Sequence, residues 1–577
     1  MIKTIASKTK GYRLVSLMSP LMILIEVIME VQLPFVMSEM VNTGIEGGAG
    51  MAYIVRQGIK MICMAIISLI SGSLAARFAA KAGMGVGANI REAVFEKIQS
   101  FSFSNIDRFS TASLVTRMTT DVNTMQMAYT MVLRIVVRSP LMFVMSFVYA
   151  HRLNASLSKV FLIAIPFLVA FLGIMGSVAL PRFKRMMKKF DGLNASVQET
   201  LIGIRVIKAF VRAKHEKEKF EISNNELKDA SIAAEKELIL SSPMMMLTVY
   251  ACIIAIFWFG GQQVIVGTMT APDLTAFITY VTQIMSSLMM ISMIFVMAIM
   301  SRASMTRVVE VLDEEPDIND STANSALEVE NGSIDFDGVS FKYKADGKKN
   351  VLDNIDLHIR SGETIGIIGG TGSAKTTLVQ LIPRLYDVTE GDVRVGGHSV
   401  KEYNLKKLRD AVAMVLQVNV LFTGTIEENL RWGNENATRE QIEQACKTAQ
   451  AHDFIAAFPD GYDTYLGQGG TNLSGGQKQR ICIARALLKS PKVLILDDST
   501  SAVDTATDAK IRNGFKENHG DITTIIVAQR ISSVEHADRI IVLDDGKINA
   551  VGTHEELLGT NEIYTEVYKS QQEGSVA

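Results

Sequence analysis

The sequence has few cysteines and almost no net charge, and each of these absences excludes a class of protein. Four cysteines occur among 577 residues, and no two of them are spaced as a metal-binding pair: Cys63, Cys252, Cys446 and Cys482. A disulfide framework or a zinc site is therefore not expected. Lys and Arg number 58 against 60 Asp and Glu, so the overall charge gives no support for a nucleic-acid partner.

Apolar residues, by contrast, are abundant and gathered into long runs. They make up 48% of the chain, which points to a membrane part. A membrane span needs about 20 mostly apolar residues. The first run is too long for the core of a signal peptide and lacks a cleavage signal, so we expect it to be retained. Expected spans lie at about 15–37, 59–80, 131–150, 160–180, 239–264 and 274–300.

The connections between these spans differ in length and in charge. Those at 81–130 and 181–238 are far longer than the others, are patterned like helices and hold most of the basic residues. Those near 41–52 and 265–273 contain no Lys or Arg. By the positive-inside bias, the long connections and both termini face the cytoplasm.

The character of the chain changes near residue 320, after the acidic stretch DEEPDINDSTANS. Short β-branched runs such as TIGIIG, KVLILDD and TTIIVAQ then alternate with helical segments. This alternation is typical of an α/β domain built on a mainly parallel sheet. We therefore predict a multidomain membrane protein, with an all-α six-helix transmembrane domain at 1–320 and an α/β domain at 321–577.

The stretch GGTGSAKTTL, residues 369–378, carries the pattern of a phosphate-binding loop (P-loop), although Ala374 replaces its second glycine. Backbone N–H groups of such a loop surround phosphates at a helix N-terminus. Lys375 would reach the β and γ phosphates of ATP, and Thr376 would bind magnesium. Ala374 is unfavourable only if its position needs a positive φ or a very close ligand. The expected ATP-binding residues of the loop are Gly369, Thr371, Gly372, Ser373, Ala374, Lys375, Thr376 and Thr377.

An apolar run, VLILD, ends in two adjacent acids, Asp497 and Asp498. A carboxylate that supports magnesium beside a phosphate loop stands at the end of a rigid buried strand. Asp497 is therefore the expected metal ligand.

The stretch NLSGGQKQR at 472–480 resembles the signature motif of ATP-binding cassette (ABC) proteins. It lies between the phosphate loop and VLILDD, and six spans with two long connections precede it, so the whole chain resembles an ABC exporter half-transporter of the bacterial multidrug type. The resemblance implies an α/β P-loop ATP-binding cassette that uses ATP and Mg²⁺ to export hydrophobic or amphipathic compounds. It also implies an integral protein of the bacterial plasma membrane, with cytoplasmic cassette and termini.

The same resemblance assigns further roles. Tyr343 would stack on adenine, Gln417 would sense magnesium and the γ-phosphate, and Asp504 would lie in the loop that crosses between two sites. Segments 105–121 and 203–220 would couple the spans to the cassettes, and 467–472 would contact the connections. Four signature residues would touch ATP held by the opposite cassette, which requires a dimer: Ser474, Gly475, Gly476 and Gln477.

Two positions depart from the family pattern. Asp498 stands where the family has a catalytic Glu, and Gln529 stands where it has a switch His. Losing one methylene withdraws the carboxylate by about 1.5 Å, and a general base must reach its water. Glutamine cannot carry a positive charge or shuttle a proton.

Because the signature is intact, the chain resembles the degenerate-site subunit of a heterodimeric exporter. The resemblance predicts a partner subunit that supplies the catalytic Glu and the switch His. Two alternatives stay open: a homodimeric exporter in which Asp498 suffices as the base, and an ATP-binding gated channel or regulator.

Two features of the spans are candidates for the substrate cavity. Glu26 and Glu30 lie four residues apart on the first span, at a depth similar to Arg134 and Arg138 on the third. They predict either an interhelical ion pair or a site for cationic amphiphiles. A methionine stripe on the last span could pack or accept apolar ligands; its members are Met285, Met289, Met293, Met297 and Met300.

Overall fold

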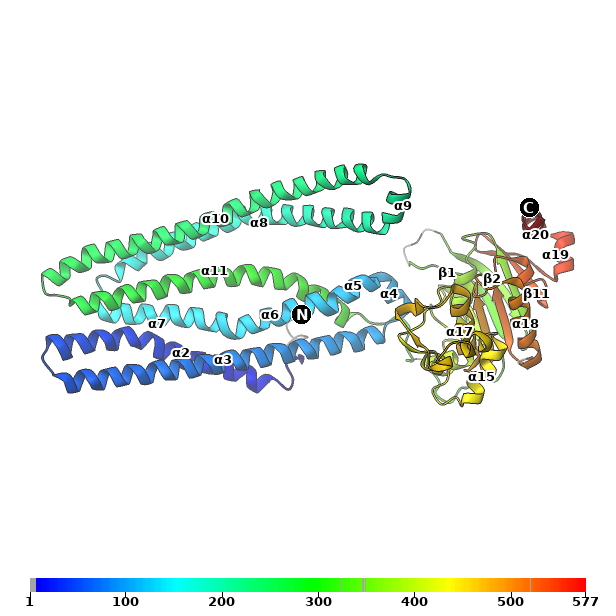
Figure 1. Cartoon of the computed structure of the whole chain (residues 1–577), viewed down its shortest axis with the longest axis horizontal. Coiled ribbons are helices and arrows are strands. Elements are labelled where there is room, and N and C mark those ends of the chain that lie inside the picture. The colour runs from blue at the N-terminus through cyan, green and yellow to red at the C-terminus, as the bar shows by residue number, and fades with distance from the viewer. Residues whose placement is uncertain (1–6, 322, 345–346, 348, 519, 577) are drawn as a thin grey trace. The chain divides into compact units, whose positions relative to one another are not determined.

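The computed structural model describes residues 7–576 apart from 322, 345–346, 348 and 519, and it divides the chain into two units (Figure 1). The first unit comprises Met1–Gln99 and Thr111–Glu314, and the second comprises Ser100–Ser110 and Glu315–Ala577. The division after Glu314 falls close to the expected boundary at 320. Ser100–Ser110, which the sequence analysis assigned to the first domain, belongs instead with the second unit.

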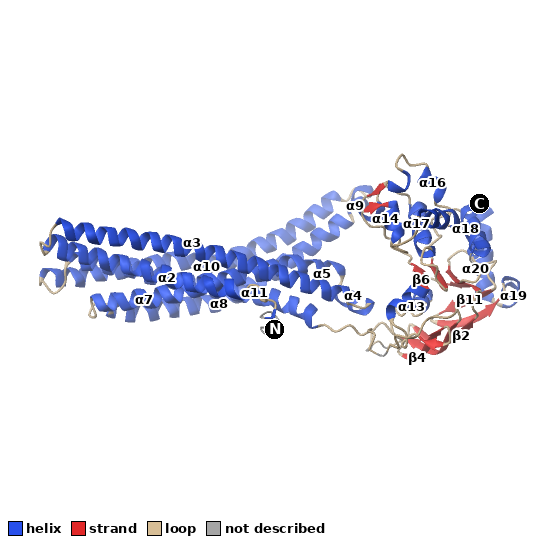
Figure 2. Cartoon of the chain, turned by 90° about the horizontal axis from the view of Figure 1, so that it is seen from below, coloured by secondary structure: helices blue, strands red, loops and turns tan. Residues whose placement is uncertain are grey.

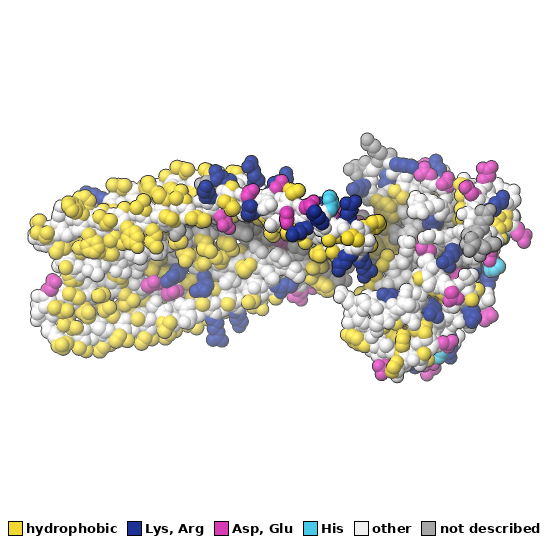
Figure 3. All heavy atoms as spheres, turned by 45° about the horizontal axis from the view of Figure 1, so that its top comes forward, with side chains coloured by type: hydrophobic (Ala, Val, Ile, Leu, Met, Phe, Trp, Pro, Cys, Tyr) yellow, Lys and Arg dark blue, Asp and Glu magenta, His cyan; other side chains and the backbone are white. Residues whose placement is uncertain are grey.

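The first unit is helical, as expected from its long apolar runs. Six of its helical stretches among the described residues are long and apolar enough to cross a membrane: Arg13–Glu46, Met51–Gln99, Thr111–Leu153, Lys159–Ile202, Pro243–Ile265 and Ala271–Ile291. The six-span prediction is thereby confirmed. In the face drawn in Figure 3, hydrophobic side chains cover one half of this unit, and charged side chains gather over the other half.

The helices of the first unit run well beyond the apolar windows, so the spans continue into the long connections without a break. Their bounds are α2 (Arg13–Glu39), η1 (Met40–Glu46), α3 (Met51–Gln99), α5 (Thr111–Thr116), η2 (Arg117–Asp121), α6 (Val122–Met131), η3 (Val132–Val136), α7 (Val137–Leu153), α8 (Lys159–Ile202), α9 (Ile204–Ala209), α10 (Ala213–Ile265) and α11 (Ala271–Asp313).

Small residues recur every fourth position along α3, at Ala75, Ala79, Gly83 and Gly87, and all four are buried. A Cβ atom added to Gly83 would collide with the hydroxyl of Thr130 in α6. A Cβ atom added to Gly87 would lie 2.6 Å from the side-chain oxygen of Gln126, which also belongs to α6. These small residues allow α6 to approach α3 closely, as small residues do between membrane helices.

The second unit is built on a six-stranded sheet in the order β12-β11-β3-β10-β9-β6; Figure 2 draws all strands of this unit in red. Four of its five neighbouring pairs are parallel, and β12 pairs antiparallel with β11 at one edge. The mainly parallel sheet is therefore confirmed. Its strands are β3 (Thr364–Gly369), β6 (Val412–Val415), β9 (Val493–Asp497), β10 (Thr523–Val527), β11 (Arg539–Asp544) and β12 (Lys547–Gly552).

A second, antiparallel sheet in the order β2-β1-β4-β5 was not expected from the sequence. Its strands, with those of a small third sheet, are β1 (Ile334–Phe341), β2 (Leu352–Ile359), β4 (Glu390–Val395), β5 (His398–Ser399), β7 (Gly424–Thr425) and β8 (Tyr465–Leu466). The helices of this unit are α4 (Phe103–Phe109), α12 (Lys375–Gln380), α13 (Leu405–Ala411), α14 (Ile426–Arg431), α15 (Arg439–Thr448), α16 (His452–Ala456), η4 (Gly461–Asp463), η5 (Gln468–Gly470), α17 (Gly475–Leu487), α18 (Thr505–Asn518), η6 (Ile531–Ser533), α19 (His554–Thr560) and α20 (Glu562–Val576).

The close contact between α3 and α6 gives a first prediction. Gly83→Leu should destabilise the helical unit by roughly 1–3 kcal/mol, the usual range for overpacking a filled interior. Gly58→Leu, on the same helix, is the matched control because a Cβ atom at Gly58 would meet nothing within 4 Å. Thermal unfolding of both purified variants in lipid nanodiscs measures the difference. Equal midpoints would contradict close packing at Gly83.

Candidate functional site

Three neighbouring parallel strands end at one edge of the main sheet, and their ends bring the P-loop together with both acids. β3 leads into the loop at Gly369, β9 ends at Asp497, and Asp497 is paired in register with Val527 of β10. Gln529 follows two residues later. A cavity of about 550 Å³ opens there. Among the residues that line it are Gly369, Thr371, Gly372, Ser373, Ala374, Lys375, Thr376, Thr377, Gln417, Asp497, Asp498, Ala528 and Gln529. Such an edge is where α/β sheets bind ligands.

The P-loop has a helix start that no side chain caps. Ala374 occupies the N-cap position of α12 and makes no capping hydrogen bond, so the first N–H groups of the helix are available to an anion. Ala374 itself adopts φ 71° and ψ 23°, in the left-handed region. This position therefore does need the positive φ that glycine adopts easily, and alanine is strained there.

Lys375 is held close to the loop. Its ammonium donates to the backbone carbonyls of Gly369 and Gly370 at 2.8 and 2.9 Å. Burial lowers the pKa of Lys375, while the neighbouring Asp498 and Asp497 oppose that shift. A phosphate would give the ammonium a stronger, charged acceptor than these neutral carbonyls.

Asp497 lies at the end of β9 with only 1% of its surface exposed. Its Oδ1 accepts a hydrogen bond from the Thr376 hydroxyl at 3.0 Å, and its Oδ2 is buried without a hydrogen-bond partner. Burial raises the pKa of Asp497. A buried carboxylate oxygen without a partner, next to a threonine hydroxyl, is a suitable site for a hard cation such as Mg²⁺.

Asp498 is held by two glutamines. The Gln529 amide donates to its Oδ2 at 2.8 Å, and the Gln417 side chain also hydrogen-bonds it. Burial raises the pKa of Asp498 despite these bonds. Its backbone is left-handed, with φ 49°, a conformation that aspartate tolerates better than most residues. The predicted trio of Asp498, Gln529 and Gln417 thus forms one hydrogen-bonded group.

Tyr343 belongs to an aromatic cluster that the sequence analysis found only in part. Its ring packs edge-on against Phe341 and Tyr386, with centroids 4.9 and 5.2 Å apart, and its hydroxyl hydrogen-bonds the Thr377 hydroxyl at 2.9 Å. The Tyr343 side chain is still 46% exposed, so one part of the ring is free for stacking.

Tyr386 links this cluster to α4, a short helix of the first long connection. Its hydroxyl donates to Asp107 at 2.7 Å, and its ring packs against Phe103 at 5.9 Å. No motif in the sequence singles out Tyr386. Asp107 lies 279 residues away in the chain, and no local pattern joins them.

The signature residues begin α17 and lie outside the cavity at the P-loop. Ser474 caps the helix by accepting from the Gln477 N–H, and the Gln477 side chain accepts from Ser474 N–H in return. A Cβ atom at Gly476 would lie 2.8 Å from the carbonyl of Ala502, so glycine is required by this close approach. Together with Gly475, these residues form the start of α17, where Ser474 and Gly475 are exposed and Gly476 and Gln477 are half-buried.

Asp504 caps the next helix, α18. Its carboxylate accepts a hydrogen bond from the Thr507 N–H at 2.9 Å, which lowers the pKa of Asp504. The Ala502 N–H donates to Gln479 at 3.1 Å. The loop after β9 is therefore fastened to both the signature helix and α18.

In the helical unit, Glu26 and Glu30 of α2 both face Arg138 of α7. Glu26 lies 3.4 Å and Glu30 2.6 Å from the guanidinium nitrogens. Gly72 of α3 makes room for Glu26, because a Cβ atom there would lie 3.1 Å from its carboxyl. The interhelical ion pair expected from the spacing is present.

The methionine stripe on α11 is divided between core and surface. Met285 is fully buried, Met289 and Met293 are half exposed, and Met297 is partly buried; the side chain of Met300 lies outside the described part. Among the described side chains of the stripe, Met289 and Met293 are therefore the most accessible to a ligand.

Comparisons with known proteins match both units of the chain to ABC transporters. A family model described as ABC transporter transmembrane region matches residues 16–305, and one described as ABC transporter matches 352–501. The chain is 37% identical over 569 residues to the uncharacterized ABC transporter ATP-binding protein YfiB of Bacillus subtilis (strain 168), covering 98% of each. It is 33% identical over 490 residues to an ATP-dependent lipid A-core flippase of Syntrophus aciditrophicus (strain SB), covering 85% of this chain and 81% of that protein.

Among solved structures, the fold matches that of a bacterial Atm1-family ABC exporter with ATP bound. The TM-score is 0.82 at 26% identity, and the match covers 97% of this chain and 98% of that one.

The left-handed backbone at Ala374 gives a second prediction. Ala374→Gly should stabilise the second unit by about 1 kcal/mol, because glycine adopts this conformation without strain. Ala528→Gly is the control: Ala528 lines the same cavity, is buried and has no positive φ, so its replacement should destabilise instead. Denaturation of the purified chain measures both changes. A loss of stability in both variants would contradict strain at Ala374.

The buried Asp497 carboxylate gives a third prediction. Because its pKa is raised in the folded state, ionisation opposes folding as pH rises through that pKa, and the effect vanishes below the ordinary value. Asp497→Asn should therefore raise the midpoint of the nucleotide-free chain at pH 7.5, by about 2–4 °C for roughly 1 kcal/mol. The gain should shrink as the pH falls toward 4.

Asp544→Asn is the matched control, since Asp544 also ends a parallel strand but is exposed. Added Mg²⁺ and ATP should stabilise the native chain more than they stabilise Asp497→Asn, which lacks the metal-binding carboxylate. A gain that is independent of pH, or equal in the Asp544 variant, would contradict the electrostatic explanation.

Proposed function

This chain belongs to the ABC transporters and has the build of an exporter half-transporter, and on that premise we propose that it is the degenerate-site subunit of a heterodimeric exporter. The observation that carries the proposal is the group of Asp498, Gln529 and Gln417, in which both departures from the family pattern are hydrogen-bonded to each other. The cargo class that we propose is hydrophobic or amphipathic.

ATP would bind at the cavity beside the P-loop. Lys375 would exchange the carbonyls of Gly369 and Gly370 for the β and γ phosphates, and the N–H groups at the start of α12 would receive the phosphate oxygens. Adenine would stack on the exposed part of Tyr343. Thr376 and Asp497 would hold Mg²⁺, which supplies charge neutralisation at the phosphates when bound.

Hydrolysis in this site would be slow because of Asp498. Its carboxylate already accepts from two amides, and it is one methylene shorter than the family's glutamate, so it reaches less far toward an attacking water. Gln529 supplies a neutral amide where a histidine would supply an ionisable ring.

The signature end of this chain, by contrast, is intact. Ser474 and Gln477 fix the start of α17, and Gly475 and Gly476 leave its backbone open. These four residues would complete an ATP site on the partner, and the catalytic Glu and switch His of that site would come from the partner.

Coupling between ATP and the spans would use the two long connections. α4 of the first connection packs beside the adenine-stacking Tyr343 through Tyr386. We assign the same kind of role, on the partner's cassette, to α9, which is followed by exposed Phe210 and Val211. ATP binding would favour the closed pair of cassettes and shift the spans between their two states.

The cargo proposal is supported by half-exposed Met289 and Met293 on α11, whose flexible side chains suit varied apolar ligands. The relative named as a lipid A-core flippase agrees with an amphipathic cargo. A homodimer that uses Asp498 as its base is the second candidate. An ATP-gated channel or regulator is the third.

Turnover of ATP by the purified chain alone tests the proposal. The native chain should hydrolyse ATP close to the rate of Lys375→Ala, which removes the phosphate-binding ammonium. Asp498→Glu combined with Gln529→His should raise turnover by about 10²-fold or more, since positioned general-base catalysis contributes about 10²–10⁴-fold.

Robust turnover by the native chain would support the homodimer instead. A chain that binds ATP but stays inactive even as the double variant, and even with a partner that carries the Glu and the His, would favour the channel or regulator. Nucleotide binding measured on the same samples separates loss of catalysis from loss of fold.

A further inference from the structure

A cavity of about 500 Å³ lies between α8 and α10 at one end of the helical unit. This end holds the connection from α7 to α8 and the connection from α10 to α11. The chain leaves the helical unit for the cassette at the other end of α11. The expected orientation places it on the outer side of the membrane. Neither ATP binding nor the candidate substrate residues involve it.

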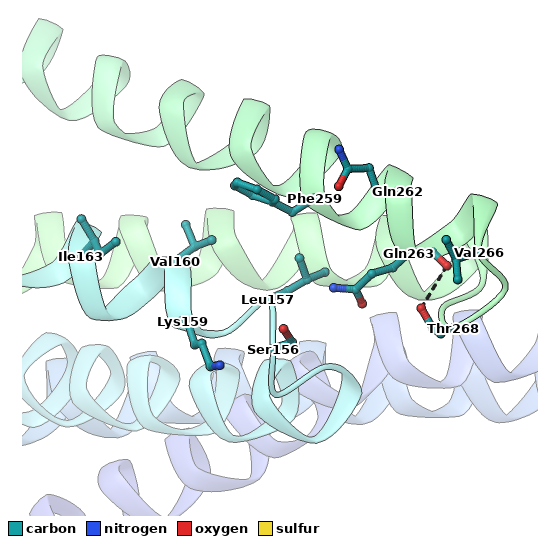
Figure 4. A pocket seen from close by; sticks show the side chains of 10 residues that line it. All are labelled: Ser156, Leu157, Lys159, Val160, Ile163, Phe259, Gln262, Gln263, Val266 and Thr268. Atoms are coloured by element: carbon teal, nitrogen blue, oxygen red, sulfur yellow. Dashed lines mark hydrogen bonds between the residues drawn. The ribbon is translucent and has the colours of Figure 1, made fainter.

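The cavity wall has an apolar part and a polar part. Figure 4 shows Phe259 and Gln263 reaching from α10 toward Val160 and Leu157. Ile163 and Val266 extend the apolar part and are more than 70% exposed. Ser156, Lys159, Gln262, Gln263 and Thr268 make up the polar part.

The polar part is cationic. Lys159 is the charged residue among those that line the cavity, and no Asp or Glu lines it. The segment 151–159, HRLNASLSK, contains Arg152 and Lys159 and no acid. The two other connections at this end contain no Lys or Arg, so these positive charges run against the positive-inside bias. A local anionic ligand would account for them.

Lys159 stands where an apolar span begins, which is the position expected of a residue at the level of lipid phosphates. It is the first residue of α8, and a long apolar stretch follows it directly. A lysine at this boundary extends its ammonium to the headgroup level while its stem stays on apolar surface. The volume falls in the usual range of small-molecule sites.

We propose that this cavity binds an anionic membrane phospholipid of the leaflet remote from the cassette. Lys159 pairs with the phosphate, and the amides and hydroxyls around it hydrogen-bond the headgroup. An acyl chain lies along Val160, Ile163 and Phe259, which a water-soluble phosphate could not use.

A photoreactive phosphatidylglycerol, with the diazirine on its acyl chain, tests the site in nanodiscs of phosphatidylcholine that hold the full-length chain. Labelled peptides should map to residues 156–163 and 259–268. Lys159→Gln should reduce this labelling by about fivefold, the factor that corresponds to one Lys contact with an anionic lipid surface. Lys159→Arg should retain it.

Lys60→Gln is the matched control, because Lys60 is an exposed lysine near the same end of α3 and does not line the cavity. Val160→Trp should abolish labelling by filling the apolar part while the charge remains. Unlabelled phosphatidylglycerol should compete, and soluble glycerol phosphate should not.

Three outcomes would overturn the proposal. They are equal labelling by a photoreactive phosphatidylcholine, unchanged labelling in Lys159→Gln, and competition by glycerol phosphate, which would make the site one for a soluble anion. Unfolding midpoints of all variants, measured in the same nanodiscs, identify any variant that fails to fold. Labelling retained in Lys159→Arg then shows that the charge at this position matters.

Discussion

A carboxylate at the end of a fully buried strand loses its hydration, and something must compensate for that loss. Asp497 is in this position: one oxygen accepts from Thr376, and the other has no hydrogen-bond partner. The nearest positive charge is Lys375, which is itself partly buried and bound to loop carbonyls. The nucleotide-free cassette therefore keeps two imperfectly compensated charges close together. Such a site is less stable without its ligands and gains most when phosphate and metal bind.

In the helical unit, the carboxylates are compensated by an ion pair rather than by a ligand. Glu26 and Glu30 share one arginine from another helix, and Gly72 leaves room for the carboxyl of Glu26. Charged groups within membrane spans are costly unless they are paired, so this pairing of α2 with α7 compensates three charges at once. In the cassette, one oxygen of Asp497 has no protein partner and can bind a ligand. In the helical unit, Glu26 and Glu30 are instead paired with an arginine of the protein itself.

Features that depend on short patterns could be predicted from the sequence. The spans follow from apolar runs, the central sheet from β-branched runs, and the meeting of the P-loop with Asp497 and Asp498 from the ends of parallel strands. The contact of Asp107 with Tyr386 could not be predicted, because it joins segments far apart in the chain and involves ordinary residues. The left-handed backbone of Asp498 is equally hidden, since aspartate is common in many conformations. At Ala374 the P-loop pattern indicated that the position could need a positive φ, and the structure shows that φ is 71°.

The short helix α4 belongs to the cassette although its neighbours in the chain belong to the spans. The polypeptide therefore passes between the two units three times, after Gln99, after Ser110 and after Glu314. A protein fragment that begins at residue 321 would lack α4, and the faces of Tyr386 and its partners that α4 covers would be left bare. A free-standing cassette would therefore have to replace the hydrogen bond and the ring contact that α4 makes with Tyr386.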